Sequence, residues 1–122
     1  MSAFLFRNAR LFDGETDHLR DGVSVLVEGD RIREVSDRAI ASASAESIDL
    51  RGLTLMPGLI DAHIHVVLTE VNLQLMADIP LTLLSAKGSV AMRAMLGRGF
   101  TTLRDTGGAD WGIKAEIGRA HV

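Results

Sequence analysis

The sequence predicts an α/β fold in which a strand-rich N-terminal part precedes two parallel β-α units, and three observations carry this prediction. Residues 3–55 consist of short apolar runs separated by turn residues, which is typical of strands. After Gly58, the apolar run LIDAHIHVV leads into a long stretch with helical spacing. A second strand-like run, FTTLRD, then follows, and strand, helix and strand in this order indicate a parallel sheet.

The N-terminal part contains three strand-like runs, FLFRNARLF, GVSVLVEGDRIREV and SIDLRGLTL. Val23, Val25 and Val27 occupy alternate positions in the second run, so their side chains share one face of a strand. Residues 28–31, Glu-Gly-Asp-Arg, supply a tight turn inside the same run and predict a hairpin. Small and polar residues fill positions 41–47, which predicts a surface loop.

The stretch between the two later strands has the features of a helical region. Pro80 suits the first turn of a helix, and Gly99 suits the position just after a helix ends. Apolar residues between them recur at helical spacing, namely Leu83, Leu84, Ala91, Met92, Met95 and Leu96. We therefore expect a helix before a strand at residues 100–103, then a turn at 106–108 and another helix that begins near Trp111.

Composition excludes several classes of protein. The chain has 122 residues, enough for one modest domain, and a formal net charge of -3, which gives no electrostatic footprint for nucleic acid or an anionic membrane. It has no cysteine, so thiolate metal sites, disulfides and a cysteine nucleophile are excluded. Arginines interrupt the apolar N-terminus, so it does not look like a signal peptide, and no apolar run is long enough to span a bilayer. We expect a soluble, cytoplasmic protein.

The histidines of LIDAHIHVV are the chief candidates for a functional site. On a strand, Asp61, His63 and His65 share one face, and this face lies at the carboxyl end of the strand, where α/β folds place their chemistry. Two imidazoles in this arrangement can converge on one cation, so a metal site is one hypothesis. The alternative is two polar residues at a strand end that pair with neighbours and water. The preceding Pro57-Gly58 and the nearby Asp61 favour the metal site.

With these residues in view, the run MPGLIDAHIH resembles the first-strand signature of the amidohydrolase superfamily, which comprises metal-dependent hydrolases built on a (β/α)8 TIM barrel with a flanking β-sandwich. The segments NARLFDG and GVSVLVEGDRIREV resemble the N-terminal sandwich strands, and GFTTLRDTGGAD resembles the second barrel strand and its loop. The resemblance implies that residues 1–55 are the N-terminal part of a β-sandwich and that 56–115 begin a barrel. Among the subgroups, the sequence is most similar to imidazolonepropionase-like enzymes and Xaa-Pro dipeptidases.

The same resemblance assigns roles to individual residues. It implies that His63 and His65 are ligands of zinc or another divalent transition metal, with one or two ions in the whole enzyme. Asp61 would have a supporting or structural part. Asp105 would either face the mouth of the site or cap the turn, and the sequence leaves both open. The catalytic general base is unknown, because the family takes it and the remaining ligands from later barrel strands.

The resemblance implies hydrolysis of a carbon-nitrogen bond in a small-molecule or dipeptide substrate, namely an amide, cyclic amide or dipeptide, by a metal-activated water. It leaves open whether the parent enzyme is a homo-oligomer. A barrel takes about 250 residues, so the resemblance implies a truncated barrel and an inactive fragment. The alternative reading is a small non-catalytic β-rich binding module with an incidental His-x-His.

The last seven residues, 116–122, have a possible origin outside the protein. EIGRAHV can be encoded by a commonly used sequencing adapter read in frame, so we expect this tail, with His121, to be non-native. A natural helix start is the alternative. Neither His121 nor His18 is placed to complete a metal site with the histidine pair.

Overall fold

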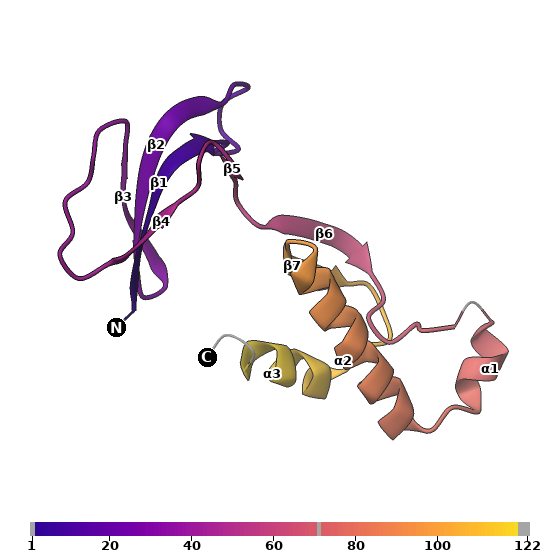
Figure 1. Ribbon diagram of the computed structural model, residues 1–122. Coiled ribbons are helices and arrows are strands. Elements are labelled where there is room, and N and C mark those ends of the chain that lie inside the picture. The colour runs from indigo at the N-terminus through magenta and orange to yellow at the C-terminus, as the bar shows by residue number, and fades with distance from the viewer. Residues whose placement is uncertain (1, 71, 120–122) are drawn as a thin grey trace. The chain divides into compact units, whose positions relative to one another are not determined.

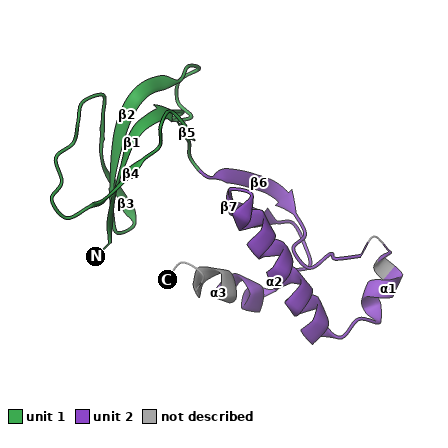
Figure 2. Ribbon diagram, in the orientation of Figure 1, with its two compact units in different colours: residues 1–57 green, residues 58–122 purple. Residues whose placement is uncertain are grey.

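The chain divides into two compact units, Met1–Pro57 and Gly58–Val122 (Figure 2). The computed structural model describes residues 2–70 and 72–119, with the side chains of residue 73 and of 116–119 left aside. Figure 1 shows that strands make up the first unit, whereas the second combines strands with helices. The predicted α/β class is therefore confirmed, and each unit has its own sheet.

Unit 1 is a five-stranded sheet (Figure 1). Its strands are β1 Ala3–Leu11, β2 Arg20–Glu28, β3 Arg31–Ser36, β4 Glu46–Asp49 and β5 Thr54–Leu55. The order is β3-β2-β1-β4, and β5 also pairs with β1. The β2–β3 hairpin is confirmed, with Gly29 and Asp30 as its turn, and the strands β4 and β5 run parallel to β1.

The core of unit 1 lies on β1 and β2. Leu11, Val23 and Val25 form a buried cluster against which Phe6, Val27 and Leu55 pack. The alternating valines thus face the core, as predicted. The opposite face of β2 is also covered at its centre, because Leu26 and its partner Leu5 on β1 are both buried. A β-sandwich, as expected from the resemblance, needs two sheets. The described part of unit 1 forms one sheet, so the sandwich stays a prediction.

A bulge in β1 joins this strand to the segment after β4. The register with β2 jumps from Phe6↔Val25 to Ala9↔Val23, which leaves an extra residue on β1. Asn8 lies in this bulge with a φ of 56°, a conformation that asparagine tolerates better than most residues. Its side-chain amide donates to Asp49 Oδ1 at 2.8 Å, and the N–H of Arg51 donates to the same oxygen at 3.0 Å. These two bonds hold the carboxylate of Asp49 in its charged form.

Replacing Asn8 with glycine is expected to raise the pKa of Asp49. The hydrogen bond from Asn8 is the main reason that this pKa lies below its usual range, and the N–H of Arg51 adds to it. Glycine keeps the positive φ without strain, so only the side-chain bond is lost. An NMR titration of the Asp49 carboxyl carbon measures the change, and the pKa of Asp13 should stay as it is. An unchanged pKa of Asp49 in Asn8→Gly would show that the asparagine does not stabilise the charged carboxylate.

The sign of the pH dependence follows from the same bonds. Because folding lowers the pKa of Asp49, its contribution to stability is present above the unfolded pKa and is lost as the pH falls through the folded one. We expect acid to destabilise the wild-type chain slightly more than the Asn8→Gly variant over this range. The carboxylate is fully exposed, so the difference is small.

Unit 2 has the predicted β-α-β order. Its elements are β6 Leu59–Ile64, α1 Leu73–Ala77, α2 Leu81–Gly97, β7 Phe100–Asp105 and α3 Trp111–Arg119. The strands β6 and β7 pair in parallel, and α2 connects them and packs on β7 (Figure 1). The helical region is divided in two, because Asn72 caps α1 and Pro80 starts α2 afresh. Gly99, with a φ of 93°, follows the end of α2 as predicted.

The first of the two parallel strands is shorter than the run LIDAHIHVV suggests. The strand β6 ends at Ile64, and the chain turns at Val66 and Val67. Its ladder stops because the N–H of Val66 donates to the carboxylate of Asp105 at 2.9 Å instead of to a strand partner. The predicted strand at 100–103 is correspondingly longer and continues to Asp105. His65 therefore lies just past the strand and not within it.

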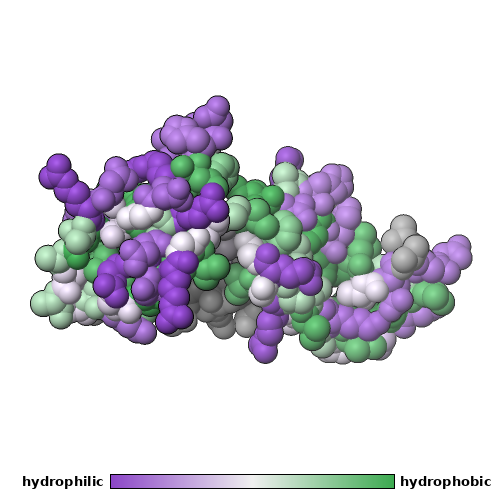
Figure 3. Space-filling model, turned by 45° about the horizontal axis from the view of Figure 1, so that its top comes forward, coloured by the Kyte–Doolittle hydropathy of each residue, from purple (hydrophilic) through white to green (hydrophobic). Residues whose placement is uncertain are grey.

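The helix α2 packs closely on the turn after β6. A Cβ atom built on Gly88 would lie 3.2 Å from the carbonyl oxygen of Val66, so any residue other than glycine needs a small shift of its neighbour. Among the described residues of this unit, Val66 and Met95 are the buried apolar ones. Hydrophobic side chains also reach the surface (Figure 3), and in unit 2 the large exposed ones are Leu59, Ile60, Leu68, Leu75, Leu81, Leu83, Val90, Leu96 and Trp111.

Two sequence expectations concern membranes and the C-terminal tail. Among the described residues, the helices are too short or too polar to cross a bilayer. The helix α3 continues through Arg119, so the first four residues of the expected tail have helical backbone. His121 lies outside the described residues, and the non-native origin of 116–122 stays a prediction.

Candidate metal centre

The two histidines of the signature lie next to each other at the carboxyl end of β6. The ring centroids of His63 and His65 are 5.5 Å apart, and the ring planes make an angle of 77°. His63 is exposed, whereas His65 is half-buried. The predicted shared face is thus retained even though the strand ends between them.

His65 is held by the loop after β7. Its Nδ1 lies 2.8 Å from the carbonyl oxygen of Gly107, and its Nε2 lies 3.3 Å from the hydroxyl of Thr106. The backbone N–H of Thr106 in turn donates to the carbonyl of Ile64 at 2.9 Å. The sequence indicated only a turn at residues 106–108, so these partners of the histidine were missed. A turn at the end of the neighbouring parallel strand was the signal that could have found them.

Asp105 joins the ends of the two strands. Its Oδ2 accepts from the N–H of Val66 at 2.9 Å, and its Oδ1 accepts from the N–H of Gly107 at 2.8 Å. Burial acts to raise the pKa of Asp105, but these two bonds, a third from Ala109 and the nearby His65 outweigh it, so the pKa lies below its usual range. Of the two roles left open by the sequence, the turn-capping geometry is present.

Asp61 lies one pleat before the pair. Its Oδ1 accepts from the backbone N–H of His63 at 3.2 Å, and the side chain is half-buried. Asp61 is the register partner of Leu103 on β7. The contact fixes the local backbone, which is compatible with the supporting part expected of this residue.

The donor set fits part of a metal site. Two neutral imidazoles are good ligands for zinc and similar cations, and they lie close enough together to share one ion. Zinc in proteins usually takes four ligands, of which three or more come from the protein. Within residues 2–70 and 72–119, no group of three or more His, Cys, Asp or Glu side chains could hold an ion. Any further ligands would come from outside this part of the chain.

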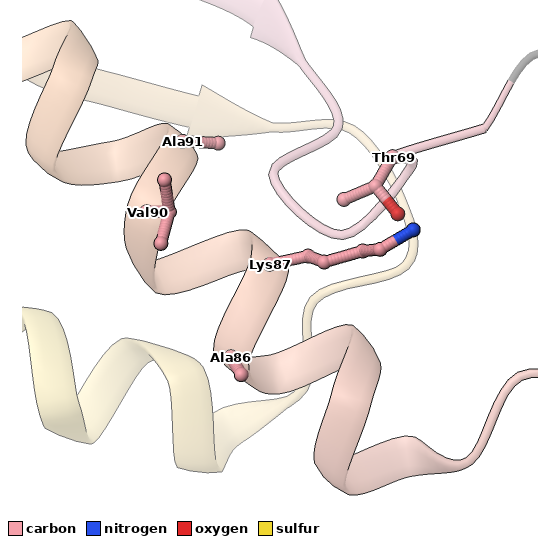
Figure 4. A pocket seen from close by; sticks show the side chains of 5 residues that line it. All are labelled: Thr69, Ala86, Lys87, Val90 and Ala91. Carbon is pink, nitrogen blue, oxygen red and sulfur yellow. The ribbon is translucent and has the colours of Figure 1, made fainter.

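A pocket of about 430 Å³ lies between α2 and the segment after β6 (Figure 4). It is lined by Thr69, Ala86, Lys87, Val90 and Ala91, and neither histidine of the pair is among them. Figure 4 shows the side chain of Lys87 extending toward Thr69. Its Nζ forms an ion pair with the carboxylate of Glu70 at 2.5 Å.

His18 belongs to unit 1 and has its own partner. Its Nδ1 lies 3.2 Å from the carboxylate of Asp17, and its side chain is 67% exposed.

Comparison with known proteins gives a family match and similar solved structures. The model of the amidohydrolase family matches residues 46–116, which include the histidine pair and β7. A crystal structure of an amidohydrolase is 47% identical, with a TM-score of 0.93 over 99% of this chain and 29% of that one. A prolidase complexed with N-methylphosphonate-L-proline is 37% identical, with a TM-score of 0.93 over 99% of this chain and 30% of that one.

Curated relatives include a dihydroorotase and an imidazolonepropionase. A dihydroorotase of Pelobacter propionicus is 33% identical over 99 residues, which cover 81% of this chain and 20% of that protein. An imidazolonepropionase of an Arthrobacter species is 32% identical over 69 residues, which cover 55% and 17%. The chain thus spans a fifth or less of these two relatives. Because the family match covers more than half of the 122 residues, the chain belongs to the amidohydrolase family.

Proposed function

We propose that the chain is part of a longer hydrolase that acts on a carbon-nitrogen bond in an amide, cyclic amide or dipeptide. The observation that carries the proposal is the adjacency of His63 and His65 at the carboxyl end of β6, with ring centroids 5.5 Å apart. In (β/α)8 enzymes this end of the strands carries the chemistry. The dihydroorotase, imidazolonepropionase and prolidase among the similar proteins support the class of bond.

The histidines would hold a zinc or similar divalent ion, alone or with a second one. When bound, such an ion supplies Lewis acidity, which lowers the pKa of water and polarises a carbonyl. This chain's own contribution is to place two nitrogen ligands and to orient one of them, His65, through the loop after β7. The general base and the remaining ligands would belong to other segments, so this chain alone is expected to be inactive.

The rival reading, a small non-catalytic binding module, requires a closed core. The large exposed hydrophobic residues of unit 2 and the two-stranded β6–β7 sheet argue for further packing partners instead. We therefore prefer a barrel that begins at β6 and a flanking sandwich to which unit 1 contributes a sheet. We also propose that the parent enzyme is located in the cytoplasm and forms a homo-oligomer.

A graft tests the proposal directly. The matching segment of the 47%-identical amidohydrolase is replaced by residues 1–115 of this chain, and the hybrid is assayed with a simple amide, a cyclic amide and an Xaa-Pro dipeptide. We expect the hybrid to hydrolyse the substrates of the unaltered host, to lose activity in a chelator and to regain it with zinc. A folded hybrid without hydrolysis, beside an active host, would contradict the proposal.

A further inference from the structure

Asp105 is bonded to two loops that are far apart in sequence. Its two carboxylate oxygens accept separately from Val66, just after β6, and from Gly107, just after β7. Asp105 is also the register partner of Ile64, so its backbone lies beside the end of β6. Bonds from a carboxylate to backbone N–H groups are charge-assisted and stronger than neutral ones. The carboxylate of Asp105 therefore helps to hold Gly107 beside His65, together with the bond from the N–H of Thr106 to the carbonyl of Ile64.

The carbonyl of Gly107 determines which nitrogen of His65 carries the proton. A carbonyl oxygen can only accept, so its 2.8 Å contact with Nδ1 requires a proton on Nδ1. In the neutral ring, Nε2 is then left with its lone pair. A metal-binding histidine needs such a free lone pair, and an N–H held by a backbone carbonyl is a common way to fix it.

Thr106 is the one complication at Nε2. Its hydroxyl lies 3.3 Å from Nε2 and also 3.3 Å from the carbonyl oxygen of Ile64. The hydroxyl can therefore donate to Nε2 or turn to Ile64 without a change in the backbone. The hydroxyl of Thr106 can thus donate to the lone pair of Nε2 in the metal-free chain. When a metal ion takes this lone pair, the hydroxyl can donate to the carbonyl of Ile64 instead.

We propose that Asp105 is a positioning residue which, through Gly107, holds His65 as the Nδ1–H tautomer and keeps Nε2 available as a ligand atom. The relevance of this arrangement to metal rests on the function proposed above, but the tautomer itself does not. Asparagine at position 105 would bring an amide N–H toward one of the two N–H donors. One of the two bonds would then be lost, so the bridge that ties Gly107 to the end of β6 would be broken whichever N–H keeps the oxygen.

Long-range ¹H–¹⁵N NMR spectra of the histidine rings test the proposal on the metal-free 122-residue chain at about pH 8, above the ordinary histidine pKa. These spectra distinguish the two tautomers from the ¹⁵N shifts. We expect mainly Nδ1–H for His65 in the wild type and in Thr106→Val, and a mixture in Asp105→Asn. Asp110→Asn is the matched control, because Asp110 Oδ1 also accepts from two backbone N–H groups, those of Gly112 and Ile113, without serving His65. The tautomer of His65 in Asp110→Asn should match that in the wild type.

Three results would overturn the proposal: mainly Nε2–H in the wild type or in Thr106→Val, an unchanged tautomer in Asp105→Asn, or an equal change in Asp110→Asn. Even where Asp105→Asn does not fold, mainly Nε2–H in the wild-type or Thr106→Val spectra overturns the proposal. Zinc alone is then titrated and followed at the same ring nitrogens, and we expect binding to His65 to be about 10-fold weaker in Asp105→Asn. No zinc response at His63 or His65 in the wild type would count against the proposed function while the tautomer result stands.

Discussion

Alanine at either His63 or His65 is expected to remove both metal and hydrolysis from the amidohydrolase hybrid that carries this chain. Each substitution deletes one of two adjacent imidazoles, whose ring centroids are 5.5 Å apart. Loss of an outer partner of a ligand already costs about 10- to 100-fold in metal affinity or activity. Loss of the ligand itself should therefore exceed the upper end of that range. Metal content by atomic spectroscopy and turnover should fall together.

His18→Ala in the same hybrid is the control for this experiment. His18 pairs with Asp17 and is largely exposed, so its removal should leave metal content and turnover unchanged. Full metal occupancy and turnover in both His63→Ala and His65→Ala would show that the pair has no part in the site. A loss confined to turnover would instead assign these residues to something other than metal binding.

Gly58→Ala is expected to destabilise unit 2 severely, because there is no room for a Cβ atom between β6 and β7. An added Cβ would overlap the Oγ1 and Cγ2 atoms of Thr101 and lie 2.6 Å from its Cβ. Rotation of the threonine side chain moves Oγ1 and Cγ2 but not Cβ, so the strands themselves must separate. Overpacking of this kind costs about 3 kcal/mol or more. Hydrogen exchange of the β6 and β7 amides in this chain measures the loss.

Two further variants make the steric explanation specific. Gly97→Ala places a methyl group where nothing lies within 4 Å, so it should be neutral or slightly stabilising. Thr101→Gly removes the atoms that the new Cβ would meet, so the double variant with Gly58→Ala should be less unstable than the sum of the two single ones. If the effects of the two single substitutions simply add in the double variant, contact with Thr101 is not the cause of the instability of Gly58→Ala.

Local chemistry explains which elements could be predicted from the sequence. The alternating valines and the Gly29–Asp30 turn define the β2–β3 hairpin within one short segment. Pro80 and Gly99 likewise mark the ends of α2 through backbone preferences that need no distant partner. The family signature could also be read directly, because its residues are contiguous.

Features that depend on distant contacts could not be predicted in the same way. The end of β6 is set by a hydrogen bond to Asp105, which lies 39 positions from Val66. The sequence left two roles for Asp105, and the capping role is seen only once the N–H of Gly107 is placed against its carboxylate. The same holds for His65 and Gly107, which are 42 positions apart. The metal-binding role of the histidines stays a prediction, because the described residues include no group of three or more His, Cys, Asp or Glu side chains that could hold an ion.

The parallel pairing of β6 and β7 also bears on the order in which the chain folds. The intervening segment, which includes α1 and α2, must close as one long loop before the first bond between these strands can form. The β2–β3 hairpin closes across a two-residue turn and loses far less chain entropy. We therefore expect the amides of the β2–β3 hairpin to be protected from exchange early in refolding and those of β7 late. The loop after β7, which holds His65, should acquire its fixed geometry only in that last phase.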